Sequence, residues 1–126
     1  MADESLVKLT LVFNDPDLDA EEKDEEVQKL LNQMQKLDEV EESYRVLDPN
    51  PPEGNKALGG FLVGMLTAVV KPENIKTLFG FFSERLKGKP IEIAIKAPDG
   101  RELNIKANSQ AEFEFAFEKA QEFLKS

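Results

Sequence analysis

The sequence predicts an α+β fold: a four-stranded mixed sheet with four helices mainly on one face. Two kinds of pattern support this. Short runs alternate apolar and polar residues, which is typical of strands, and longer runs place an apolar residue every three or four positions, which is typical of helices. The expected order is strand, helix, strand, helix, helix, strand, strand, helix. Residues 1–126 are expected to form a single α+β domain, because neither side of the proline-rich stretch near residue 50 has enough apolar residues for a core of its own.

The first third of the chain predicts two strands joined by a helix. Residues 6–13 have the most apolar strand pattern and are expected to be central. Asp19 and Glu22 have the spacing of a capping box, so a helix is expected to begin there and to end near Leu37. Residues 40–47 alternate again and predict a half-buried strand at or near an edge. A strand–helix–strand unit of this kind is expected to be parallel.

The segment 56–70 has no charged residue after Lys56, and the next charge is Lys71. As a helix it would be apolar on every side. We interpret it as a helix that is either buried all round or used as an interface. Gly60, Gly64 and Ala68 recur at intervals of four and would leave one side smooth, as in closely packed helix pairs. The uncharged run is shorter than the roughly 20 residues that span a bilayer, so stable membrane insertion is not expected.

A second helix should follow from Pro72 to Gly88, and then a hairpin. The turn Pro98–Asp99–Gly100 joins the two hairpin strands. The register that it sets pairs apolar residues on one face and opposite charges on the other. The apolar pairs are Ile91–Ala107, Ile93–Ile105 and Ile95–Leu103, and the charged pairs are Glu92–Lys106 and Lys96–Glu102. One face of the hairpin is therefore expected to be wet, which favours helices on the other face. The two helices before the hairpin should also make its first strand antiparallel to the first two strands.

The last helix begins at a second capping box, Ser109 to Glu112. Phe113 and Phe117 lie on its apolar stripe, whereas Phe115 points away from that stripe at about 100° per residue. An exposed aromatic beside the apolar helix would extend a binding patch. Candidate interaction residues are therefore Gly60, Gly64, Ala68 and Phe115.

The composition excludes several function classes. The chain has no cysteine and no histidine, which removes disulfides, thiolate and imidazole chemistry and the usual zinc ligands. Residues 1–48 hold fifteen acids against five bases, a balance of −10, within a net charge of −9. This repels nucleic acid, and the acidic cluster is best explained as a solubilising face. The start of the chain has no signal-peptide pattern, so a cytoplasmic protein is expected.

The acidic residues before and within the first helix partly match a calcium loop. Asp15, Asp17, Asp19 and Glu26 match positions one, three, five and twelve of a calcium loop, but Ala20 replaces the required glycine. A capped acidic helix start explains the same residues better. No phosphate-loop motif and no activated serine is present. We therefore predict no catalytic residue, no metal and no cofactor.

Four features together resemble one known family. They are the Pro51-Pro-Glu-Gly loop, Gly59-Gly60 followed by Gly64, the Lys89-Pro-Ile segment, and the Pro98-Asp-Gly-Arg101 turn. They are similar to the effector-associated constant component family, small stand-alone proteins of bacterial conflict systems. The resemblance implies a protein partner, such as a peptidase or signalling ATPase effector in immunity or programmed death. It implies no catalytic residues.

The expected function is thus a non-enzymatic protein-interaction component of a bacterial, cyanobacterial-like conflict, immunity or programmed-death system. The alternative is a binding module for an apolar small molecule or a membrane surface, acting through the 56–70 helix. A small hydrolase is a third class, which no motif in the sequence supports.

Overall fold

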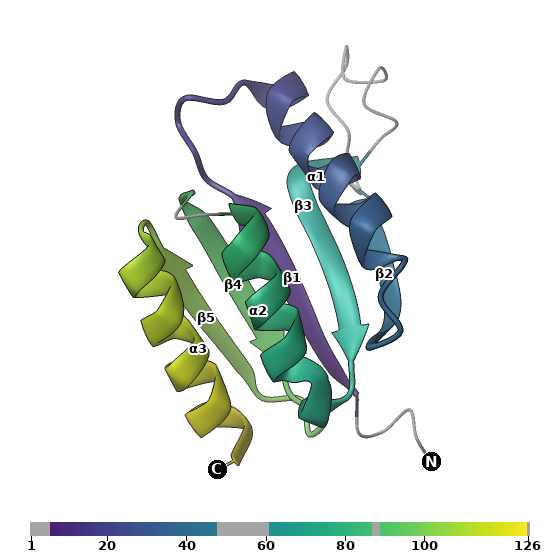
Figure 1. Cartoon of the computed structure of the whole chain (residues 1–126), viewed down its shortest axis with the longest axis vertical. Helices are drawn as coiled ribbons and strands as arrows, with labels where there is room; N and C mark the ends of the chain where they lie inside the picture. Colours follow the sequence, from purple (N-terminus) through teal and green to yellow (C-terminus); the bar gives the residue numbers. More distant parts are fainter. Residues whose placement is uncertain (1–5, 48–60, 87–88, 126) are drawn as a thin grey trace.

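The computed structural model describes residues 6–47, 61–86 and 89–125 (Figure 1). Within these ranges the chain forms five strands, three α-helices and one short 3-10 turn. In order they are β1 (Val7–Phe13), α1 (Ala20–Met34), β2 (Val40–Leu47), β3 (Phe61–Val70), η3 (Pro72–Asn74), α2 (Ile75–Leu86), β4 (Ile91–Lys96), β5 (Glu102–Ala107) and α3 (Gln110–Lys125). The α+β class is confirmed, but the described part has one strand more and one helix fewer than predicted.

The strands form one sheet in the order β2-β3-β1-β4-β5. Every neighbouring pair is antiparallel, so the sheet is not mixed as predicted. β1 and β2 do run in the same direction, but β3 lies between them. β1 is central and β2 is an edge strand, as predicted. β4 runs antiparallel to both, which confirms the predicted reversal of the chain.

The main correction concerns residues 61–70, which form strand β3 and not part of a helix. Residues 56–60 lie outside the described residues. β3 is hydrogen-bonded to β1 on one side and to β2 on the other. Thr67, Ala68 and Val69 are 4%, 0% and 3% exposed, so consecutive residues on opposite faces are all buried. A strand buried on both faces has a continuous apolar run, which by composition alone also fits a buried helix.

Gly64 interrupts β3 at a bulge. Between the pairs Arg45–Leu66 and Leu47–Phe61, β3 advances five residues while β2 advances two. Gly64 lies in this stretch with φ +69°, a left-handed conformation that glycine adopts without the steric cost of a side chain. A Cβ built there would lie 3.4 Å from Lys23 Cβ, which is ordinary contact. The backbone conformation, and not close helix packing, explains this glycine.

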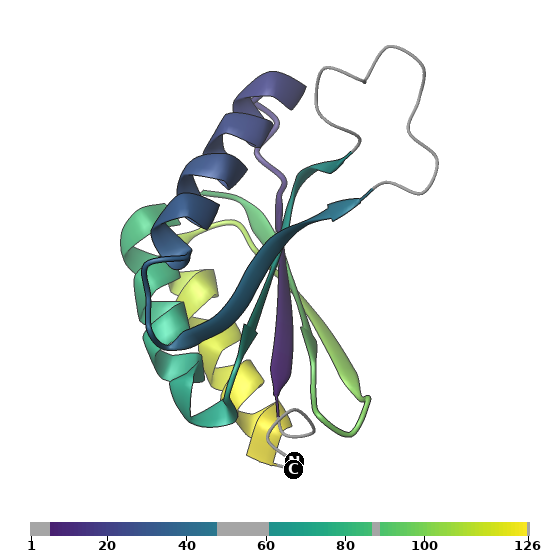
Figure 2. The same ribbon diagram turned by 90° about the vertical axis from the view of Figure 1, so that its right-hand side faces the viewer.

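The helices lie on one face of the sheet in the described part of the chain, as Figure 2 shows from the side. The apolar residues of that face pair across the three inner strands, with Leu9 of β1 between Ala68 of β3 and Ile95 of β4. The helices bury Val27, Leu30, Met34, Leu78, Phe79, Phe82 and Phe113 in the same cluster. The prediction of helices mainly on one face is confirmed. This arrangement buries the apolar stripe of each helix against the apolar face of the sheet.

The hairpin has the predicted register at all five pairs. Gly100 adopts φ +95° in the turn, and Glu92 Oε1 lies 3.6 Å from Lys106 Nζ. The Asp99 carboxylate accepts hydrogen bonds from the backbone N–H and from Nε of Arg101, at 3.1 and 2.7 Å. The backbone N–H of Arg101 is the main cause that lowers the pKa of Asp99. Local turn chemistry and cross-strand pairing agree here, which is why the sequence alone predicted the hairpin.

Both predicted capping sites are present. Asp19 and Glu22 form a complete capping box at α1, although α1 ends at Met34, earlier than predicted. At α3 the N–H of Glu112 donates to Ser109 Oγ at 3.2 Å. The Glu112 carboxylate accepts from the N–H of Asn108 at 2.8 Å, one residue before the expected position. These bonds satisfy N–H groups that a helix start leaves without a partner within the helix.

The substitution Gly64→Ala is expected to lower the free energy of unfolding by about 1–2 kcal/mol, because a left-handed backbone brings Cβ close to the following carbonyl oxygen. Urea denaturation measures the loss. Gly64→Asn is the control and should lose less, since asparagine tolerates this conformation better. Equal losses for the two variants would contradict the left-handed assignment.

Candidate functional site

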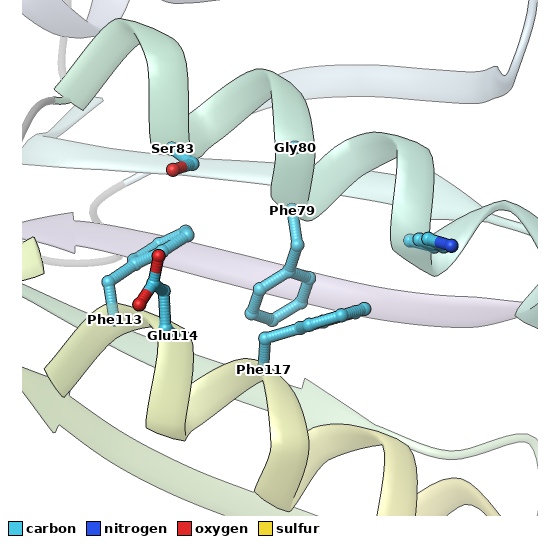
Figure 3. A pocket seen from close by; sticks show the side chains of 7 residues that line it. Phe79, Gly80, Ser83, Phe113, Glu114 and Phe117 are labelled. Carbon is cyan, nitrogen blue, oxygen red and sulfur yellow. The ribbon is translucent and has the colours of Figure 1, made fainter. Parts of the chain in front are cut away.

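A hollow of about 230 Å³ lies between α2 and α3 on the outer, helical side of the molecule (Figure 3). It is called the α2–α3 groove below. It is lined by Lys76, Phe79, Gly80 and Ser83 of α2 and by Phe113, Glu114 and Phe117 of α3. Most of this lining is apolar, which makes the groove the strongest candidate for a binding surface in the described part of the chain.

Three aromatic side chains form the base of the groove. Phe79 extends from α2 toward α3, and Phe113 and Phe117 extend from α3 toward α2 (Figure 3). The Phe79 ring centroid lies 5.5 Å from that of Phe113 and 5.1 Å from that of Phe117, and both pairs are tilted. These are favourable aromatic separations. Phe79 and Phe113 are buried and Phe117 is half-buried, so the rings belong to the core and also present an edge to the groove.

Gly80 forms part of the α2 wall. It lies in the interior of the helix, where glycine lowers the stability of the helix by about 1 kcal/mol relative to alanine. Its backbone does not require glycine, since the positive φ angles among the described glycines belong to Gly64 and Gly100. No atom lies within 4 Å of a Cβ built at Gly80, so packing does not require glycine either. The effect of this glycine is to leave the groove wide.

The polar groups of the groove lie at its margins. Gln110 Nε2 donates to Ser83 Oγ at 2.5 Å, linking α3 to α2. An amide cannot take a proton from a serine hydroxyl, so this contact does not activate Ser83 as a nucleophile. Lys76 and Glu114 also line the groove and carry opposite charges. The arrangement offers apolar contact with a polar margin, which suits binding better than acid–base chemistry.

A second hollow, of about 410 Å³, lies near the other end of the same two helices. It is lined by Pro72, Glu73, Ile75, Lys76, Gln121, Leu124 and Lys125. Lys76 lines both hollows. The two hollows therefore adjoin at Lys76, and the second one is the more polar.

The structure does not bring the sequence-predicted interaction residues together. Gly60 lies outside the described residues. Ala68 is fully buried in the core and Gly64 is buried in the bulge of β3. Phe115 is 56% exposed, as predicted, but it lies on α3, which packs on β5 at the far edge of the sheet from β2 and β3. The sequence reasoning missed Gly80, whose signal was a glycine inside the helical pattern of residues 75–86.

The uncovered face of the sheet is polar over β4 and β5, where Lys96, Glu102, Asn104 and Lys106 are exposed. Thr10 Oγ1 and Thr67 Oγ1 are hydrogen-bonded at 3.0 Å across β1 and β3, and Glu92 pairs with Lys106 across β4 and β5. Tyr44 of β2 is 39% exposed, on the face to which its pairing partner Thr67 belongs. In β3, however, Thr67 and Val69 of this face are buried, at 4% and 3% exposed. The uncovered face is therefore a weaker candidate for apolar binding than the α2–α3 groove.

The acidic residues near α1 take part in local structure. Asp15 Oδ1 accepts from the N–H of Asp17 at 3.0 Å, and Asp19 caps α1. Glu26 Oε1 accepts from Lys89 Nζ at 3.0 Å. Asp24 forms an ion pair with Arg45 of β2. Within the described residues, no group of three or more acidic side chains is placed to hold a metal ion.

None of the described helices is both long enough and apolar enough to cross a bilayer.

Calcium titration tests the capping explanation directly. No saturable binding is expected at sub-millimolar calcium, because a calcium site needs six to eight converging oxygens, whereas these carboxylates make separate local contacts. Nuclear magnetic resonance shifts of Asp15, Asp17, Asp19 and Glu26 are the measurement. Stoichiometric binding with one coherent set of shifts would overturn the explanation.

Alanine substitutions in α3 test which side chains of this helix point into the core. Phe113→Ala should lower the free energy of unfolding by about 3–5 kcal/mol, because it removes a buried ring. Phe115→Ala should change it by less than about 0.5 kcal/mol. Phe117→Ala should fall between them, since that ring is half-buried. Urea denaturation of the three variants measures the free energy of unfolding. A large decrease for Phe115→Ala would contradict the outward position of this side chain.

Comparison with known proteins adds no relative. No family model matches this sequence, and neither a curated protein nor a solved structure matches it.

Proposed function

We propose that the chain is a non-enzymatic protein-interaction component that holds an apolar side chain of a protein partner in the α2–α3 groove. The observation that carries the proposal is Gly80. It lowers helix stability, its backbone and surroundings do not require glycine, and it keeps an apolar groove wide. A residue that lowers the stability of the fold and is not required by its backbone or its packing is typical of a functional surface.

The size of the groove favours a protein partner over a small molecule. Small-molecule sites usually have volumes of about 300–1,000 Å³ and enclose most of the ligand. The α2–α3 groove has about 230 Å³, nearer the size of one large side chain. Protein interfaces concentrate their binding energy in a few such anchors, often aromatic, seated in pockets with a polar margin. Lys76 and Glu114 supply that margin.

The resemblance to the effector-associated constant component family supports the class of partner. It favours a peptidase or signalling ATPase of a bacterial conflict, immunity or programmed-death system, and a place in the cytoplasm beside it. The alternative, apolar binding through a helix at residues 56–70, loses its basis because residues 61–70 form an inner strand of the sheet.

Two substitutions at Gly80 separate stability from binding. Gly80→Ala should raise the free energy of unfolding by about 0.5–1 kcal/mol, because alanine favours the helix and fits the open space. Gly80→Leu should also stay folded, but it should fill the groove. Urea denaturation measures both variants. A clear loss of stability for Gly80→Ala would show that glycine is needed for structure.

Binding is measured by calorimetry against the purified product of a neighbouring effector gene. Gly80→Leu should weaken the complex at least about tenfold, which corresponds to about 1.4 kcal/mol. Asn32→Leu, which places the same side chain on the exposed face of α1, is the control and should bind like the wild type. Unchanged binding by a folded Gly80→Leu protein would exclude the groove as the binding surface.

A further inference from the structure

The α2–α3 groove lies beside the most exposed large apolar side chain in the described residues. Phe115 of α3 is 56% exposed, compared with 39% for Tyr44, the other exposed large hydrophobic residue of that part. Phe113, Ala116 and Ala120 of the same helix are buried against the sheet, so Phe115 points outward. The ammonium of Lys119 lies 5.1 Å from the centre of its ring. An aromatic side chain presented in this way can act as an interface anchor.

We propose that two copies of this chain associate through α3, with Phe115 of each copy seated in the α2–α3 groove of the other. The proposal rests on the groove as the binding surface of the proposed function and names one occupant for it. The groove has about 230 Å³ and aromatic walls, so it suits a single phenylalanine ring, which would add to the cluster of Phe79, Phe113 and Phe117.

The position of both parts on one helix permits a symmetric contact. Glu114 and Phe117 line the groove, and Phe115 lies between them in sequence but points to the outer side of α3. In a two-fold dimer each subunit offers the same patch, so that residue i contacts residue j and residue j contacts residue i. A two-fold axis passing beside α3 would place the Phe115 ring of each copy in the groove of the other copy.

The charges around the two parts are complementary. Lys119 accompanies Phe115 on the outer side of α3, where its Nζ also lies 3.7 Å from Oε2 of Glu122 in an exposed pair, and Glu114 lines the groove. When Phe115 enters the partner's groove, its Lys119 is carried toward the partner's Glu114. The reciprocal contact brings a second lysine to a second glutamate. Opposite charges at the margin favour this orientation over one that brings like charges together.

The contact is expected to be weak. One ring and one charged pair at each of the two contacts bury less than the roughly 1,200 Å² of a stable complex, so dissociation constants on the order of 0.1–1 mM are expected. Such an association is reversible, and it competes with any other protein for the same groove. Self-association would thus hold the groove closed at high concentration until a tighter partner displaces it.

Sedimentation equilibrium and nuclear magnetic resonance on the full chain test the proposal, from about 10 µM to about 1 mM, the range in which a contact of this size forms. Signals of Gly80, Phe113 and Phe115 should shift together with concentration. Phe115→Ala and Gly80→Leu should each weaken association at least about tenfold. Tyr44→Ala, which removes the other exposed aromatic, is the control and should associate like the wild type.

Mixing the two defective variants is the decisive experiment. Phe115→Ala keeps an open groove, and Gly80→Leu keeps the ring that enters it. The mixture should therefore associate more tightly than either variant alone, through one of the two contacts, but less tightly than the wild type. A wild-type chain that stays monomeric at about 1 mM, or a dimer that neither substitution weakens, would overturn the proposal. Loss of association in Tyr44→Ala would instead place the contact on the uncovered sheet face.

The outcomes also separate this proposal from the function on which it rests. A monomeric wild type whose effector partner is lost on Gly80→Leu would overturn self-association and leave the groove as a partner site. A dimer that dissociates on Gly80→Leu, in a chain whose effector complex is unaffected by that change, would support self-association and overturn the partner proposal.

Discussion

The pairing of β1 with a strand on each side is the constraint on which the rest of the structure depends. β1 lies between β3 and β4, and its residues Val7, Leu9 and Leu11 are fully buried. The residues that they face across the sheet, among them Ala68, Leu66, Ile93 and Ile95, are buried as well. This gives the sheet one strongly apolar side. Each amphipathic helix must place its stripe there, because burial of apolar area is the main favourable term in folding.

The groove follows from how the helices share that side. α3 packs on β5 and α2 lies next to it, so Phe79 of α2 reaches into the space between Phe113 and Phe117 of α3 (Figures 1 and 3). Three rings at these separations fill the lower part of the space. The upper part stays open, because the α2 wall carries glycine at position 80. A core contact and a surface hollow thus share the same aromatic residues, which ties the shape of the groove to the stability of the fold.

The acidic first third of the chain has a more structural role than its charge suggests. Asp19 caps α1, Asp24 pairs with Arg45 of β2, and Glu26 pairs with Lys89 before β4. The Arg45 side chain is only 6% exposed, so its partner Asp24 offsets the cost of burying a charge. Glu21 and Glu25 are exposed on α1, and α3 carries four exposed glutamates, at positions 112, 114, 118 and 122. Acidic side chains thus lie on α1 and also on α3, beside the groove.

The sequence by itself determined the features that depend on near neighbours. The hairpin register, the caps at Asp19 and Ser109, and the outward position of Phe115 each follow from residues a few positions apart. Only the tertiary structure decided that residues 61–70 are a strand. An uninterrupted apolar run satisfies the helical and the buried-strand pattern alike, and the choice is made by hydrogen bonds to β1 and β2, which are distant in sequence. The groove could not be predicted from the sequence for the same reason, since Gly80 forms a groove only together with Phe113 and Phe117 of another helix.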